Sequence, residues 1–223
     1  INTMVNSKIP LDYQVLKPKT QLDRPSPAAF FLHGYGANEL DLLSLSNYFP
    51  SDIFIISLRA PFPISGGYCW YPIHLSPTGA VPDQPDLDSL TQSMNLLSQS
   101  RDALIDLYDL NPQKIGLLGF SQGTILSLST LCTNPSNYSW CVGLNGYLPR
   151  SFPNSSTLEL LNKSVFLSAG INDELIPLSK VEITRNKLVE LGCDVTFSSH
   201  SGGHYIGENV FAELQQWLPE HIY

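Results

Sequence analysis

Short apolar runs alternate with longer segments of helical periodicity along this chain. Apolar runs without polar alternation predict strands that are buried on both faces, as in a parallel sheet. These runs lie at residues 28–32, 53–58, 115–120, 140–144 and 165–168, and a strand-like run follows at 195–199. The pattern therefore predicts a mostly parallel central sheet.

Amphipathic helices are predicted between the apolar runs. In residues 87–110, apolar side chains recur at intervals of three, four and seven, which places them on one helical face. Asp86 or Asp88 can cap the start of this helix, and Asn111-Pro112 ends it. Further helices are predicted at residues 122–132, 178–191 and 209–218. The alternation predicts an α/β fold with helices on both faces of the sheet, in a single domain over residues 1–223.

The stretch from Arg59 to Pro85 interrupts this alternation and is rich in proline and aromatic residues. Loops of this length in a compact domain are functional or disordered, and disordered segments are poor in aromatic residues. We therefore expect an elaborated substrate loop, in which Phe62, Trp70 and Tyr71 form apolar walls around a bound substrate. Ile176 is the fourth expected substrate contact. Trp70 or Tyr71 taken singly is equally consistent with a residue that covers the core.

Composition and charge narrow the classes of partner. Only 14% of the residues are charged, and the formal net charge is −8. Nucleic acids require clustered Lys and Arg, which this chain lacks. No apolar stretch reaches the roughly 18 residues that a membrane-spanning helix needs. We therefore expect neither nucleic-acid binding nor stable membrane insertion, and the overall negative field disfavours strongly anionic substrates.

The four cysteines, Cys69, Cys132, Cys141 and Cys193, form no C-x-x-C pair. Their spacing therefore indicates neither a zinc site nor a redox motif, and we expect no metal. Three of them have apolar neighbours, which predicts buried free thiols. Two disulfides in a secreted protein are the alternative. Free thiols and the absence of a signal peptide from the printed residues favour a cytoplasmic location.

Gly119-Phe120-Ser121-Gln122-Gly123 matches the pattern G-x-S-x-G at the junction of a predicted strand and a predicted helix. This is the setting of a nucleophile elbow, a sharp turn that brings backbone close on both sides of the serine and so favours glycine at the flanking positions. A glycine-containing turn with a capping serine is the plainer interpretation. The strand and helix on either side favour the elbow.

A serine hydroxyl needs a base to remove its proton. In hydrolases with such an elbow, an acid and then a histidine follow the serine along the chain. That order leaves His200 and His204, because His221 lies close to the end, where we expect a frayed tail. His204 is favoured because it follows Gly202-Gly203, in a loop that can carry the imidazole to the site. His200 remains the alternative.

The acid is expected after a late strand, where Asp173 follows the run at residues 165–168. Glu174 and Asp194 are its rivals, and a turn-stabilising aspartate is the plainer role for Asp173. A carboxylate in this position fixes the tautomer of the histidine and stabilises the imidazolium that forms.

Two backbone N–H groups are needed to stabilise the negatively charged oxygen of the intermediate. Gln122, directly after the serine, supplies one. Tyr35 supplies the other, from the turn His33-Gly34-Tyr35-Gly36 after the first predicted strand. His33 itself is expected to be a buried, structural hydrogen-bonding residue. A simple glycine turn is the interpretation of this segment when it is taken alone.

Together these segments resemble the phospholipase/carboxylesterase family and its bacterial carboxylesterase branch. This α/β-hydrolase group includes acyl-protein thioesterases. The matching segments are Leu32–Glu39 with Asp41-Leu42, Arg59–Pro61, Trp70-Tyr71, Gly119–Gly123, Asn172-Asp173 with Ile176-Pro177, and Gly202–His204 with Trp217-Leu218. The resemblance implies an α/β-hydrolase fold without a large lid domain and without a cofactor. It also implies Ser121 as nucleophile, Asp173 as acid and His204, over His200, as base.

The chain departs from the family pattern at two positions. Pro72 follows the Trp-aromatic pair where the family often has an acidic residue, and Thr124 stands after the last glycine of the elbow where many members have a small residue. Both departures bear on substrate preference and leave the expected chemistry unchanged.

These observations predict a serine carboxylesterase that hydrolyses short- to medium-chain carboxylic esters, and by extension acyl-thioesters or lysophospholipids, through an acyl-enzyme. A dienelactone-type hydrolase or a peptidase is the alternative among enzymes. The non-enzymatic alternative is a catalytically silent small-molecule receptor on a hydrolase fold, which should lack a triad residue. The expected partner is a small acyl ester, with formation of a homodimer left open.

Overall fold

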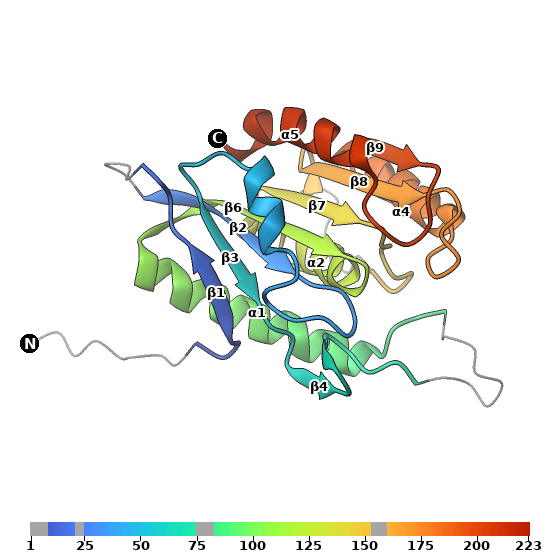
Figure 1. The fold of residues 1–223 in the computed structure, drawn as a ribbon, viewed down its shortest axis with the longest axis horizontal. Helices are drawn as coiled ribbons and strands as arrows, with labels where there is room; N and C mark the ends of the chain where they lie inside the picture. The colour runs from blue at the N-terminus through green and yellow to red at the C-terminus, as the bar shows by residue number, and fades with distance from the viewer. Residues whose placement is uncertain (1–8, 21–24, 75–82, 153–159) are drawn as a thin grey trace, which may run out of the picture.

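A computed structural model describes residues 9–20, 25–74, 83–152 and 160–223 of the 223-residue chain. Within these ranges, seven strands form one central sheet in the order β1-β3-β2-β6-β7-β8-β9 (Figure 1). The strands are β1 Tyr13–Leu16, β2 Ser26–Leu32, β3 Phe54–Leu58, β6 Leu110–Phe120, β7 Trp140–Leu144, β8 Ser164–Gly170 and β9 Asp194–His200. Every neighbouring pair is parallel except β1 with β3. The predicted mostly parallel sheet is confirmed.

Helices cover both faces of this sheet. They are α1 Leu87–Tyr108, α2 Gln122–Thr133, α4 Leu178–Glu190 and α5 Glu208–Ile222, with short 3-10 helices η1 Leu43–Tyr48 and η2 Pro135–Asn137. Successive side chains of a strand point to opposite faces. Phe30 of β2 accordingly joins a core with residues of α1 and α2, and Phe31 joins a second core with residues of η1 and α5. Figure 1 shows α1 and α5 on opposite sides of the sheet.

The ends of several elements differ from the prediction. Of the two candidate caps of α1, Asp86 is the one that acts, since its Oδ1 accepts from the Ser89 N–H at 2.8 Å. Helix α1 ends at Tyr108 because Asp109 adopts a left-handed conformation with φ 51°, and the expected stop at Asn111-Pro112 lies within β6. The strand β1 and the helix η1 were not predicted.

The C-terminus is helical where we expected a frayed tail. Helix α5 extends to Ile222, and His221 Nδ1 lies 2.7 Å from the Trp217 carbonyl oxygen. The His221 ring stacks on the Trp217 indole with a centroid distance of 4.0 Å. Packing of this last turn on the core explains why the expectation was wrong.

The expected loop at residues 59–85 contains a two-stranded hairpin, β4 Phe62–Ile64 paired with β5 Gly67–Cys69. Residues 75–82 of this loop lie outside the described ranges. All four cysteines are buried and none forms a disulfide, so the predicted thiols are confirmed over the disulfide alternative. In the described parts of the chain, no helix is long and apolar enough to cross a membrane, and no group of three or more His, Cys, Asp or Glu side chains could hold a metal ion.

Candidate active site

Ser121 occupies a strained turn between β6 and α2. Its φ of 54° and ψ of −116° are unusual for a residue with a side chain, and its N–H donates to the Leu144 carbonyl at 2.8 Å. A Cβ atom on Gly123 would lie 1.9 Å from the Leu32 carbonyl oxygen, and one on Gly119 would lie 2.3 Å from the Gly123 backbone. The two motif glycines are therefore required by the close approach of backbone segments. Strain of this kind is typical of functional sites.

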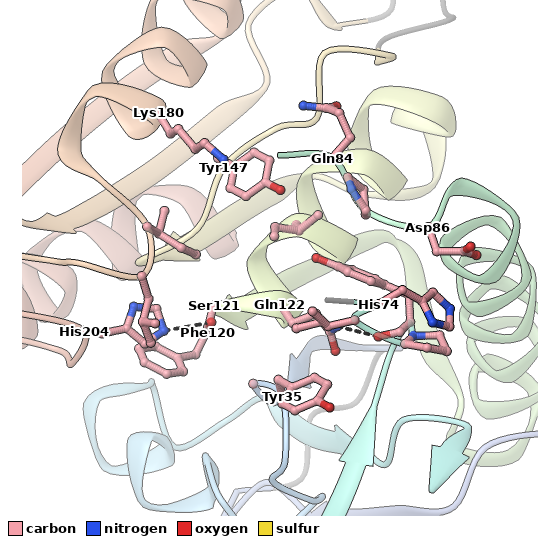
Figure 2. Close-up of a pocket in the computed structure, with 18 residues that line it drawn as sticks. Tyr35, His74, Gln84, Asp86, Phe120, Ser121, Gln122, Tyr147, Lys180 and His204 are labelled. Carbon is pink, nitrogen blue, oxygen red and sulfur yellow. Dashed lines mark hydrogen bonds between the residues drawn. The ribbon is translucent and has the colours of Figure 1, made fainter. Parts of the chain in front are cut away.

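The His204 ring joins the serine to the predicted acid. Its Nε2 lies 2.8 Å from Ser121 Oγ (Figure 2), and its Nδ1 lies 2.7 Å from Asp173 Oδ2. Because an ionised carboxylate only accepts, Nδ1–H donates to Asp173, and Nε2 is left to accept from the serine hydroxyl. The three side chains, which come from the ends of β6, β8 and β9, form one continuous hydrogen-bonded chain.

Asp173 is buried, and the turn around it keeps it ionised. Its Oδ1 accepts from the backbone N–H groups of Leu175 and Ile176, each at 2.9 Å. Burial works to raise the pKa of the Asp173 carboxyl, but hydrogen bonds from Ile176 and His204 outweigh burial and hold this pKa below its usual value. The turn-stabilising role and the contact with the histidine are thus both present, one on each carboxylate oxygen.

The alternatives from the sequence lie elsewhere. His200, at the end of β9, is buried, and its Nδ1 accepts from the Gly202 N–H at 3.1 Å. It lies outside the cavity that Ser121 and His204 line. Glu174 is exposed, and Asp194 begins β9, at the opposite end of the strand from the serine. None of the three joins the hydrogen-bonded chain.

Two backbone N–H groups are available beside Ser121. Among the described residues, the N–H groups of Tyr35 and Gln122 have no protein acceptor, and both residues line the same cavity as the serine. The turn that carries Tyr35 is held by the hairpin, because the Gly36 N–H donates to the Tyr68 carbonyl and the Tyr68 N–H donates to the Ala37 carbonyl, both at 2.9 Å.

His33, the residue before this turn, has a structural role, as predicted. Its Nε2 accepts from the Ala60 N–H at 3.1 Å, so its Nδ1–H donates to the Gly34 carbonyl at 2.7 Å. Burial lowers the pKa of His33 and keeps the ring neutral. Both ring nitrogens are thus occupied in the core.

A cavity of about 520 Å³ opens beside Ser121. Its walls are largely apolar and aromatic, and apart from His204 and Gln122 the labelled polar side chains at the other end of the cavity, such as Gln84 and Lys180, stand farther from the serine (Figure 2). The apolar lining comprises Tyr71, Pro72, Ile73, Pro85, Phe120, Ile125, Leu175 and Ile176, and the polar lining includes His74, Gln84, Asp86, Tyr147 and Lys180. Mostly apolar cavities with a few polar groups are typical of small-molecule sites.

Two of the four expected substrate contacts line this cavity, and two do not. Tyr71 and Ile176 are in the lining. Trp70 is 0% exposed, and its indole N–H donates to the His33 carbonyl at 2.8 Å, so its assignment to the cavity wall is wrong. Phe62 is paired with Cys69 in the hairpin and is also absent from the lining.

The Gln122 side chain fastens the cavity wall, a role that the sequence did not indicate. Its Oε1 accepts from the Trp70 N–H, and its Nε2 donates to the Tyr71 carbonyl, both at 2.7 Å. Ser93 of α1 also donates to the Trp70 carbonyl, at 2.5 Å. One residue therefore offers its backbone N–H to the cavity and uses its buried amide to hold the segment Trp70-Tyr71.

The far end of the cavity carries a second fastening, which we call the clasp: Asp83 and Gln84 bound to Lys180 and Arg150. Lys180 Nζ lies 2.7 Å from Asp83 Oδ1, and the Arg150 N–H donates to Gln84 Oε1 at 3.0 Å. Lys180 is thereby paired with a carboxylate. This end of the cavity is consequently polar but carries no unpaired positive charge.

Other lining residues could have been found partly from sequence. Ile125 lies one helical turn after Ser121 on α2, and Leu175 lies two residues after Asp173, so both follow from the positions of the motif residues. Tyr147, in the segment after β7, and Lys180, in α4, reach the cavity by tertiary packing, and nothing in their local sequence indicates the cavity.

Comparison with known proteins finds carboxylesterases and acyl-protein thioesterases. Acyl-protein thioesterase 1 from Yarrowia lipolytica is 29% identical over 160 residues, which cover 69% of this chain and 68% of that protein. A probable inactive carboxylesterase from Oryza sativa is 25% identical over 223 residues, which cover 91% and 88% of the two chains. The crystal structure of the Bacillus cereus carboxylesterase matches with a TM-score of 0.81 at 23% identity, covering 97% of each chain.

The structural similarity and the family match show that this chain has the α/β-hydrolase fold. The sequence model of the Phospholipase/Carboxylesterase family matches residues 16–222. Because this match covers nearly the whole chain, the chain belongs to the phospholipase/carboxylesterase family.

Proposed function

We propose that this protein is a serine esterase that hydrolyses short- to medium-chain carboxylic esters through an acyl-enzyme. The observation that carries the proposal is the hydrogen-bonded chain from Ser121 through His204 to Asp173, at the edge of a largely apolar cavity. Membership of a carboxylesterase family supports hydrolysis of esters or thioesters.

The proposed reaction has two steps that share one histidine. Ser121 Oγ attacks the acyl carbonyl carbon while His204 Nε2 takes the serine proton, and the Tyr35 and Gln122 N–H groups stabilise the oxyanion. The carbon–oxygen or carbon–sulfur bond of the leaving group then breaks, and the alcohol or thiol departs with the proton from His204.

Deacylation repeats these roles with water as the nucleophile. His204 Nε2 takes a proton from water, which attacks the acyl carbon, and the proton then passes to Ser121 Oγ as the carboxylic acid leaves. Asp173 stays ionised throughout and stabilises the imidazolium in both steps. The proposed mechanism therefore consumes only water and the ester.

The lining of the cavity supports an uncharged acyl chain as the preferred group. Its apolar walls favour methylene groups, and the polar side chain of Lys180 is already paired with Asp83. The net charge of −8 adds a field that opposes anionic substrates.

The proposal is tested by comparing substrates that share one acyl group. Rates of hydrolysis are measured for p-nitrophenyl esters with acyl chains of about two to twelve carbons, together with an acyl-thioester and an anilide. We expect ester and thioester turnover with the highest kcat/KM at short or medium length. A faster anilide than ester would favour a peptidase. Binding of the esters without turnover would favour the silent receptor. The Oryza sativa relative is itself named a probable inactive carboxylesterase.

A further inference from the structure

Asn145, directly after β7, has an unusual backbone and a fully buried side chain. Its φ is 49°, in the left-handed region that favours glycine, and its exposed fraction is 0%. Its N–H donates to the Ser168 carbonyl of β8 at 3.0 Å, which fixes the backbone between two strands. A left-handed residue with a side chain is strained, and such strain persists where the surroundings or the function require it.

The Asn145 amide reaches two parts of the proposed catalytic machinery. Its Nδ2 donates to Asp173 Oδ2 at 3.2 Å, the carboxylate oxygen that also contacts His204. The same nitrogen donates to the Gly203 carbonyl at 3.4 Å, in the residue directly before His204. One amide thus links the acid to the loop that carries the histidine.

The orientation of this amide is set by its neighbours. Among the described residues, Asn145 Oδ1 has no hydrogen-bond partner although it is buried. Reversal of the amide would turn this oxygen toward the Asp173 carboxylate and the Gly203 carbonyl, and like partial charges would repel. The present orientation therefore leaves an acceptor unpaired in order to give the acid a donor.

Asn145 differs in location from two other described residues that have a side chain and a positive φ. Asp109 and Asn162 have φ values of 51° and 61° and lie on the exposed surface, in turns next to α1 and β8. Ser121 and Asn145 are the two at the candidate active site. Ser121 bonds to His204 and Asn145 bonds to Asp173, the partner of that histidine, so strain at both residues points to a shared functional requirement.

We propose that Asn145 is a positioning residue that holds Asp173 and the His204 loop in register and limits the charge that Asp173 presents to His204. This inference rests on the proposed function. Asn145 occupies one of the lone pairs of Asp173 Oδ2, and so it weakens the pull of that oxygen on a protonated His204. Without the donor, the imidazolium is held more strongly, and a higher pH is needed to free the base.

Three variants test the proposal through the pH dependence of ester hydrolysis. Asn145→Gly removes the donor but accepts the left-handed backbone without strain. Asn145→Asp keeps the shape and places a second carboxylate beside Asp173. Asn162→Gly is the matched control, because it relieves the same backbone strain at an exposed turn. The acid limb of the kcat/KM profile reports protonation of the base in the free enzyme, and His204 is the titratable group bonded to Asp173.

We expect Asn145→Gly to reduce kcat about 10-fold with little change in KM, and to move the acid limb upward by a few tenths of a pH unit. Asn145→Asp should move this limb upward by about one unit, since the added negative charge stabilises the imidazolium. Asn162→Gly should leave both unchanged. A Gly variant with the kcat and acid limb of the parent would overturn the proposal, as would a lowered Tm with an unchanged pH profile.

The result separates failure of this inference from failure of the proposed function. If the parent protein hydrolyses no ester, the proposed function is wrong and the inference falls with it. If the parent is active and the Asn145 variants behave like it, only the inference is wrong. Asn145→Gly keeps the test independent of the Asp variant, whose buried extra charge could prevent folding.

Discussion

The edge of the sheet that carries Ser121, Asn145 and Asp173, which we call the proposed catalytic edge, is built differently from the cavity wall. At the proposed catalytic edge, residues from the ends of neighbouring strands bond to one another, so that Ser121, Asn145 and Asp173 each have backbone or side-chain partners from an adjacent strand end. The cavity wall at Tyr71 is instead held by side chains distant in sequence, namely the buried Gln122 amide and, through the Trp70 carbonyl, the Ser93 hydroxyl, and the partly exposed clasp lies at the far end of the cavity. We infer that changes at the edge alter the rate of the chemistry, whereas changes at the wall alter which substrates are accepted.

The sharpest contrast within the edge is that between the two histidines. His204→Ala removes the proposed base, and we expect kcat to fall by a factor on the order of 10⁴. His200→Ala removes an acceptor for the Gly202 N–H and a ring contact with Tyr205, neither of which belongs to the hydrogen-bonded chain, and should reduce kcat less than 10-fold. Steady-state kinetics with one ester check both variants. Equal losses in the two variants would mean that the base has been assigned wrongly.

The wall is tested most strongly at Gln122. Gln122→Met keeps the volume and the backbone N–H but leaves the Trp70 N–H and the Tyr71 carbonyl without their partner. Each unpaired buried group costs about 1–3 kcal/mol, so we expect a lower free energy of unfolding by denaturant. We also expect KM to rise about 10-fold for the longer esters with a smaller change in kcat.

Ser127→Ala is the matched control for this variant. Ser127 is buried on the same helix, and its hydroxyl donates only to the Gly123 carbonyl one turn earlier. It should lose some stability and keep the selectivity of the parent for chain length. A Gln122→Met protein with unchanged selectivity would show that the amide stabilises the fold without shaping the cavity.

The clasp should have the smallest effect, because exposed ion pairs contribute little. Hydrogen bonding to Lys180 lowers the pKa of Asp83, so the clasp is present above the ordinary carboxyl pKa and is lost as the pH falls through the lowered value. Asp83→Asn should change the ratio of long- to short-ester rates about threefold or less, and 1 M salt should produce the same change in the parent protein. Glu220→Gln, an exposed change on α5, should leave this ratio alone. A larger change in the ratio of long- to short-ester rates in Asp83→Asn than in Gln122→Met would reverse the comparison.

The same comparison shows which features could be predicted from the sequence and which could not. The carboxyl ends of β2, β3, β6 and β7 and the Ser121 turn follow from local patterns, because apolar runs and glycine spacing act over a few residues. Asp173 and His204 are favoured by their place after late strands, and the family resemblance decides for His204 over His200. The burial of Trp70 could not be predicted, since it depends on groups from α1, α2 and His33 that are distant in sequence.

Asn145 and His221 also escaped prediction for physical reasons. A single asparagine after an apolar strand carries no local sign that its amide will reach a carboxylate 28 residues later. His221 lies near the end of the chain, and its stacking on Trp217 together with the buried Ile222 holds that turn on the core. Contacts of this kind arise from tertiary packing, which periodicity does not encode.

The central claim is that Ser121 is the nucleophile, and covalent trapping tests it most directly. Folded protein is treated with a fluorophosphonate, the modified peptide is identified by mass spectrometry, and residual ester hydrolysis is measured in the same sample. We predict one adduct on Ser121, loss of activity in proportion to labelling, and much slower labelling of His204→Ala. An adduct at another residue, or full labelling of Ser121 with undiminished ester hydrolysis, would contradict the account.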